Sequence, residues 1–71
     1  MPREAIIRKV SPYELHGVLY YQIFFSYADT PNILSEVRLS HDAVYLSPSD
    51  GDRVIVENIL SMVTDVKKKD D

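Results

Sequence analysis

The chain has 71 residues and no cysteine, with 45% hydrophobic residues and a formal net charge of −3 at pH 7. This length allows one domain with a thin stability margin, because so short a chain buries only about 60% of the surface that it exposes when unfolded. The lack of cysteine excludes disulfides and thiolate metal sites. The acidic charge counts against generic nucleic-acid binding, and self-association or a partner is an expected source of added stability.

No targeting or membrane segment is visible in the sequence. The first residues, Met-Pro-Arg-Glu, carry charges where a secretory signal would need an apolar run. The longest apolar stretch, Val18 to Phe25, is interrupted by Gln22 and is far shorter than the roughly 20 residues of a membrane span. We therefore expect a cytoplasmic protein that does not contact a membrane.

The first predicted element is a strand over Glu4 to Val10, where β-branched residues alternate with basic ones. A connection over residues 11–17 follows and contains Pro12, whose missing N–H costs nothing in a loop. His16 and Gly17 close this connection, since Gly17 can adopt the positive φ that a hairpin return demands. The segment predicts the first half of a hairpin with a long loop.

The clearest strand signal covers residues 18–27, where every second side chain is apolar or aromatic. Aromatic and β-branched residues fill this run, which disfavours a helix. We predict the central strand here. Its core face holds Leu19, Tyr21, Ile23, Phe25 and Tyr27, and its other face holds Val18, Tyr20, Gln22, Phe24 and Ser26.

Turn residues at 28–32 precede a third predicted strand over Ile33 to Leu39. Ile33, Val37 and Leu39 share one face of this strand, and Glu36, Arg38 and Ser40 share the other. A short helix capped by Thr30 is the competing prediction, but residues 37–40 alternate in the manner of a strand. Residues 40–45 favour a single helical turn with Ser40 as its cap, and residues 47–52 form a loop.

Residues 53–68 fit two structures. A helix would place Ile55, Ile59 and Val63 on one face. A hairpin would run from Arg53 to Glu57, turn at Asn58 and return over Leu60 to Lys67. The many β-branched residues favour the hairpin. We place the domain at residues 1–66 and a disordered charged tail at 67–71.

A helical turn over His41 to Tyr45, followed by the strand motif Gly-Asp-Arg-Val-Ile-Val at residues 51–56, resembles the second half of small SH3-like or OB-like barrels. This likeness is to an architecture and carries no functional residue. We expect an all-β (mostly β) fold, a five-stranded, partly open SH3/OB-like barrel with one short helical turn. The alternative is an α+β fold with a three-stranded antiparallel sheet and a C-terminal helix.

The residues that could carry chemistry are few and isolated. Neighbouring His41 and Asp42 point to opposite faces of a strand and rarely share one metal ion. Asp50 and Asp52 lack the further oxygen ligands that calcium needs. Ser40 beside His41 implies no triad geometry, and two glycines cannot build a phosphate loop. We predict no enzyme, no metal and no cofactor.

A protein–protein interface is the function for which the sequence offers direct support. If the central strand turns its all-apolar face inward, Val18, Tyr20 and Phe24 lie outside as an exposed cluster, which is typical of an interface. Arg8 and Arg38 on neighbouring strands complete this candidate interface. The first hypothesis is a protein–protein interaction or self-association module, such as a homodimer, and the alternative is a single-stranded nucleic-acid binder. Residues 13–16 or 44–46 could instead cover the cluster.

Overall fold

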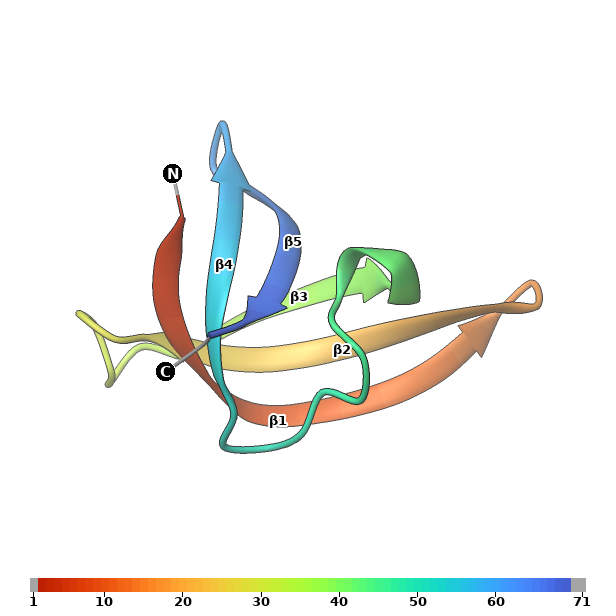
Figure 1. Cartoon of the computed structure of the whole chain (residues 1–71), viewed down its shortest axis with the longest axis horizontal. Coiled ribbons are helices and arrows are strands. Elements are labelled where there is room, and N and C mark those ends of the chain that lie inside the picture. The colour runs from red at the N-terminus through yellow and green to blue at the C-terminus, as the bar shows by residue number, and fades with distance from the viewer. Residues whose placement is uncertain (1, 70–71) are drawn as a thin grey trace.

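A computed structural model describes residues 2–69 as one antiparallel sheet of five strands with a single short helical turn (Figure 1). The elements are β1 (Arg3–Leu15), β2 (Val18–Tyr27), β3 (Ser35–Ser40), the 3-10 turn η1 (His41–Ala43), β4 (Arg53–Ile59) and β5 (Met62–Lys68). The strand order is β3-β2-β1-β4-β5. The mostly β class is confirmed. The alternative with a C-terminal helix is wrong, because residues 53–68 form the β4–β5 hairpin.

Strand β1 serves both halves of the sheet because it bends at a β-bulge. Residues Arg3 to Ile6 pair with β4, while Ala5 to Leu15 pair with β2 (Figure 1). The register with β2 shifts between Ile7 and Lys9, and the loop before β4 is fastened at that point. The Gly51 N–H donates to the Ile7 carbonyl at 2.7 Å, and the Val10 N–H donates to the Asp50 carboxylate at 2.9 Å. The bulge therefore redirects β1 from β4 toward the end of the long hairpin.

The sheet curls without closing into a barrel. Its edge strands β3 and β5 do not pair with each other. The segment after η1 bridges them instead, since Val44 forms a parallel bridge with Val66 and the Tyr45 N–H donates to the Val66 carbonyl at 3.2 Å. The expectation of a partly open barrel-like sheet is met at this level, without a specific barrel type.

The core lies inside the curl. Strand alternation directs apolar side chains of four strands into it, as predicted for Ile23 and Phe25. Tyr21, Tyr27, Val37 and Leu39 pack around its margin. The buried apolar residues are Ala5, Ile7, Ile23, Phe25, Val44, Val54, Val56 and Val66. So small a core makes each member costly to lose.

The β1–β2 hairpin differs from the prediction in its length. Strand β1 continues through Pro12 to Leu15, and only His16 and Gly17 form the turn. Both have positive φ, 52° and 77°, which matches the right-handed twist of a two-residue hairpin. Pro12 is tolerated because its nitrogen points away from β2, toward an edge where no ladder requires an N–H.

The third strand and the helical turn are shorter than predicted. Strand β3 begins at Ser35 instead of Ile33, and Ile33 and its neighbour Leu34 are exposed. The turn η1 covers only His41–Ala43 and is a 3-10 turn. Ser40 stands at its N-cap position but makes no side-chain cap bond, because its hydroxyl hydrogen-bonds the Asp42 carboxylate.

The predicted turn at Asn58 is wrong. The ladder continues through Asn58 opposite Val63 after a bulge, and the turn lies at Leu60 and Ser61. The tail also begins later than predicted, because β5 reaches Lys68 and the Lys69 N–H donates to the Arg53 carbonyl at 3.0 Å. Residues 70–71 of the predicted tail lie outside the described residues.

Candidate functional site

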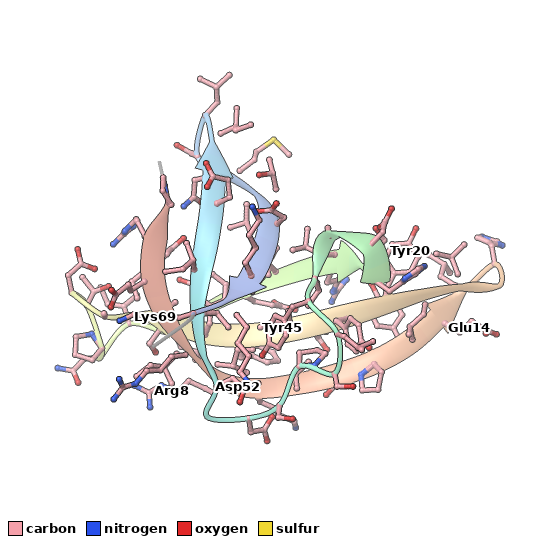
Figure 2. The ribbon with its side chains drawn as sticks, in the orientation of Figure 1. Arg8, Glu14, Tyr20, Tyr45, Asp52 and Lys69 are labelled. Atoms are coloured by element: carbon pink, nitrogen blue, oxygen red, sulfur yellow. The ribbon has the colours of Figure 1, made fainter. Side chains whose placement is uncertain are left out.

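The face of β1, β2 and β3 that points away from the core is the candidate site, and we call it the outer face. The register places alternate residues of the three strands on it. All five predicted interface residues, Val18, Tyr20, Phe24, Arg8 and Arg38, lie on this face, with Arg8 in the bulge. Figure 2 labels Arg8 and Tyr20 among them. The other members are Lys9, Ser11, Tyr13, Leu15, Gln22, Ser26, Glu36 and Ser40.

An aromatic and aliphatic cluster occupies the turn end of the outer face. Tyr13 and Tyr20 are cross-strand partners whose rings stack, with centroids 5.6 Å apart and planes at 17°. Next to them, Leu15 and Val18 form the last pair before the turn and are 49% and 40% exposed. Tyr13 and Leu15 belong to this cluster as its β1 members, and Val44 packs in the core instead of over it.

Polar and charged groups occupy the middle of the outer face. Arg38, with 65% of its side chain exposed, has its Nε 3.5 Å from the Glu36 carboxylate. Gln22 donates from its amide to the same carboxylate. The Arg8 Nε donates to the hydroxyl of buried Ser26 at 3.3 Å. Arg8, Lys9 and Arg38 against Glu36 give this face a positive balance although the chain is acidic.

A groove of about 360 Å³ joins the two regions of the outer face. Tyr13 and Leu15 provide its apolar wall, and Ser11, Gln22 and Arg38 provide polar groups. Phe24 is half-buried beside it, opposite Lys9 on β1 and Glu36 on β3. The groove can take an extended segment that offers an apolar side chain at one end and an acidic group at the other.

The sequence prediction missed the β1 contribution to this groove. Ser11, Tyr13 and Leu15 were placed in a loop, so their common face was not recognised. Reading the residues outward from a two-residue His16-Gly17 turn pairs Leu15 with Val18 and Tyr13 with Tyr20. This matching of apolar partners across the turn was the available signal.

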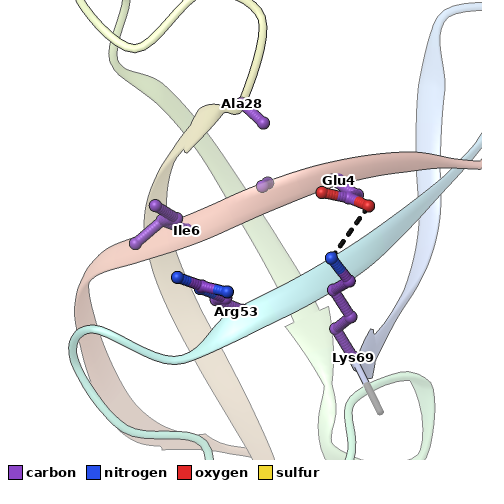
Figure 3. Close-up of a pocket in the computed structure, with 6 residues that line it drawn as sticks. Glu4, Ile6, Ala28, Arg53 and Lys69 are labelled. Carbon is purple, nitrogen blue, oxygen red and sulfur yellow. Dashed lines mark ion pairs between the residues drawn. The ribbon is translucent and has the colours of Figure 1, made fainter. Parts of the chain in front are cut away.

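A second hollow, of about 220 Å³, lies where β1, β4 and the chain end after β5 meet (Figure 3). Glu4, Ile6, Arg53 and Lys69 line it. The Lys69 ammonium and the Glu4 carboxylate face each other across it at 3.0 Å. Because these two charges neutralise each other, the hollow ties the chain end to β1 and offers less to a ligand than the outer-face groove.

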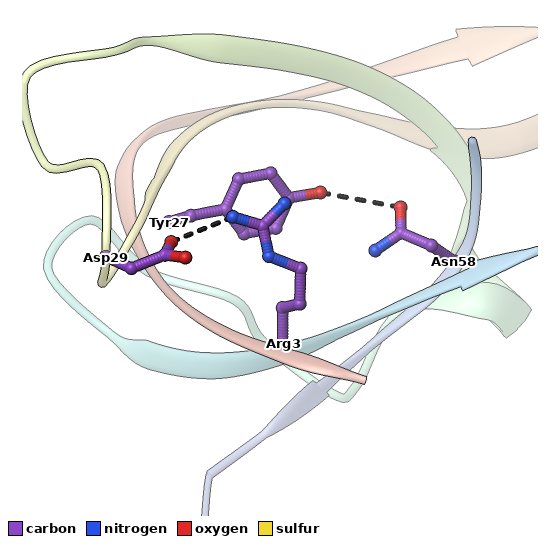
Figure 4. Close-up of polar contacts among 4 residues, drawn as sticks. All are labelled: Arg3, Tyr27, Asp29 and Asn58. Carbon is purple, nitrogen blue, oxygen red and sulfur yellow. Dashed lines mark hydrogen bonds and ion pairs between the residues drawn. The ribbon is translucent and has the colours of Figure 1, made fainter. Parts of the chain in front are cut away.

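The start of β1 is held by a cluster around Tyr27 (Figure 4). The Arg3 guanidinium lies 3.6 Å from the ring centroid of Tyr27 and forms a 2.8 Å ion pair with Asp29. The Tyr27 hydroxyl donates to the Asn58 side-chain oxygen at 3.4 Å. These contacts join β1, the end of β2 and β4, and we assign them a structural role.

Tyr45 and Asp52 clamp the long loop between η1 and β4. The Tyr45 hydroxyl donates to the Asp52 carboxylate (Figure 2). Burial, together with this hydrogen bond, raises the pKa of Tyr45 above its ordinary value of 10.0. The same bond lowers the pKa of Asp52 below its ordinary value of 3.8. Both shifts favour a neutral phenol that donates to a charged carboxylate, and this hydrogen bond stabilises the loop.

Two other kinds of feature are absent from the described part of the chain. Across residues 2–69, no three His, Asp or Glu side chains are grouped so that they could hold a metal ion. In the same range, no helix is long and apolar enough to cross a bilayer. Comparison with known proteins gave no match to a protein-family model, a curated protein or a solved structure. The outer face is therefore the feature on which a function can be argued.

Proposed function

We propose that the chain is a non-enzymatic protein-interaction module that binds through its outer face. The observation that carries the proposal is one open groove on the outer face, lined by Tyr13 of the stacked Tyr13–Tyr20 pair and by the predicted interface residue Arg38. Aromatic anchors bordered by arginine are enriched at protein interfaces.

The groove favours an extended peptide segment of a partner protein. An apolar side chain of the ligand would lie against Tyr13 and Leu15, where water is displaced from exposed apolar surface. A ligand carboxylate would compete with Glu36 for Arg38, whose guanidinium is mostly solvent-exposed. Ser11 and Gln22 would hydrogen-bond the ligand backbone between these two points.

Selection of peptides from a random displayed library against the immobilised chain tests this proposal. We expect enriched peptides that combine an apolar and an acidic residue and bind with measurable affinity in calorimetry. Leu15→Asp should reduce that affinity about tenfold or more, because it places a charge on the apolar wall. Leu15 is half-exposed, so the substitution should leave the fold intact.

Leu46→Asp is the matched control. Leu46 is 91% exposed in the loop before β4, away from the outer face, so the same substitution there should leave peptide binding unchanged. Peptides whose binding is equally sensitive to both substitutions, or a failure to enrich any peptide, would refute a binding role for the outer face.

Single-stranded nucleic-acid binding is the second candidate, favoured by the stacked tyrosines beside Arg8, Lys9 and Arg38. Titration with labelled oligonucleotides at low and higher salt tests it. A nucleic-acid binder should bind best at low salt, because phosphate contacts release counterions, and Tyr20→Ala should weaken it. Absence of binding at low salt would remove this candidate and leave the peptide-binding proposal standing.

A further inference from the structure

Apart from strand ends of two or three residues, three strand edges in the described chain have no ladder partner, and they are not equally available. These are the far half of β1 beyond its pairing with β4, the outer edge of β5 and the outer edge of β3. An unpaired edge presents a row of N–H and C=O groups that can template another strand, so proteins generally protect such edges. Which of the three is unprotected indicates where a partner strand can add.

The β1 and β5 edges are protected. On β1, the Val10 N–H already donates to Asp50, and Pro12 has no N–H to offer. On β5, the Val66 carbonyl accepts from the Tyr45 N–H, and exposed Lys67 and Lys68 follow it. Proline, capping contacts and lysine are the usual means by which a sheet edge is closed to addition.

The β3 edge has none of these features. Strand β3 pairs with β2 without a bulge and contains no proline or glycine. β5 crosses β3 at a steep angle and does not run alongside it (Figure 1). In a hairpin with a two-residue turn, the residues next to the turn are hydrogen-bonded, and hydrogen-bonded pairs alternate from there. Leu15 and Val18 form such a pair, so Val18, Tyr20 and Gln22 of β2 direct their backbone groups toward β1. Their neighbours on β3 are therefore not hydrogen-bonded to β2 at these positions. The backbone groups of Glu36, Arg38 and Ser40 point away from β2.

The charges on β3 are complementary to a second copy of the same strand. In an antiparallel pairing centred on Val37, Glu36 lies opposite Arg38 of the other copy, and Arg38 lies opposite its Glu36. Both pairs are of the hydrogen-bonded kind and use the outward backbone groups. Centring the pairing on Glu36 or Arg38 instead would place like charges directly opposite each other, which is unfavourable. Of these three registers, only the one centred on Val37 satisfies both the backbone and the charges.

We propose that two copies of this chain join edge to edge through β3, in an antiparallel register centred on Val37. The two-fold axis would pass beside Val37, whose half-buried side chain would meet its counterpart. The result is a continuous ten-stranded sheet in which the two outer faces lie side by side. The occupant of the edge is a second copy because the opposite charges at Glu36 and Arg38 complement themselves.

Charge reversal tests the register by mass measurement in sedimentation or light scattering over a wide concentration range. The wild type should approach twice the chain mass of 8.2 kDa. Glu36→Arg alone and Arg38→Glu alone should each weaken the dimer about tenfold or more, because both cross-strand pairs become repulsive. An equal mixture of the two variants should dimerise again, since one strand is then all positive and the other all negative. The chain with both substitutions should also dimerise.

Three outcomes would overturn the proposal. They are a wild type that stays monomeric, single variants that dimerise as well as the wild type, and single variants that are not rescued by mixing although circular dichroism shows them folded. The last two outcomes would assign any dimer to another surface. If β3 instead pairs with a strand of a different protein, the wild type alone would stay monomeric, which is the first outcome. Peptide binding sensitive to Leu15→Asp is measured separately, so failure of the dimer leaves the proposed function intact.

Discussion

Leu60 and Ser61 adopt positive φ values, 51° and 69°, at the tip of the β4–β5 hairpin. This left-handed conformation costs a residue with a Cβ about 1 kcal/mol, whereas asparagine and glycine adopt it readily in two-residue turns. The Leu60 side chain is 93% exposed, so no packing is lost when it is replaced. We expect Leu60→Asn with Ser61→Gly to stabilise the chain by about 1 kcal/mol and to raise its melting temperature by roughly 5 °C.

Leu46→Asn is the control for this change. It replaces an equally exposed leucine with the same residue type, but at a position without a positive φ. Thermal unfolding followed by circular dichroism should show stabilisation for the turn variant only. If both variants melt at the same temperature as the wild type, the backbone of this turn stores no strain.

At the scale of strands, the sequence predicts which side chains are buried better than it predicts where each strand ends. Alternation identified the core face of β2, on which Ile23 and Phe25 are buried, because a period of two is imposed by burial on one side. Pro12 and Asn58 misplaced both hairpin turns, since each residue type is typical of loops. In the structure, Pro12 faces an edge where no N–H is needed, and Asn58 accepts from Tyr27 across the sheet. Both uses depend on tertiary neighbours.

The candidate site shows the same division. Tyr20, Phe24 and Arg38 could be assigned to one face because alternation runs from strand to strand. Tyr13 could not, because its place depends on the two-residue turn that brings β1 back along β2. The bulge that keeps Arg8 on the outer face leaves no mark in the local sequence, since the contacts that fix it come from the distant loop at residues 50–52.

At the scale of the whole molecule, a small core and an open edge are connected. A chain of this length with no cysteine, and with eight buried apolar residues among residues 2–69, has little stability in reserve. The curl of the sheet leaves the β3 edge unpaired within the described residues. The outward N–H and C=O groups of β3 therefore face solvent instead of another strand. Pairing two such edges would add ladder bonds and ion pairs without enlarging the core.

Dimerisation through β3 should therefore make thermal stability depend on protein concentration. Because only folded chains can pair, mass action raises the free energy of unfolding once most of the protein is dimeric. The increase is at most about 0.7 kcal/mol per chain for each tenfold rise in concentration. For a domain of this size, that corresponds to a melting temperature higher by about 3 °C per tenfold step. Calorimetry over a concentration series should show this slope for the wild type and for the chain with both Glu36→Arg and Arg38→Glu. Glu36→Arg alone should show a flatter slope over the same concentrations, and a slope as steep as that of the wild type would mean that the stabilising contact lies away from β3.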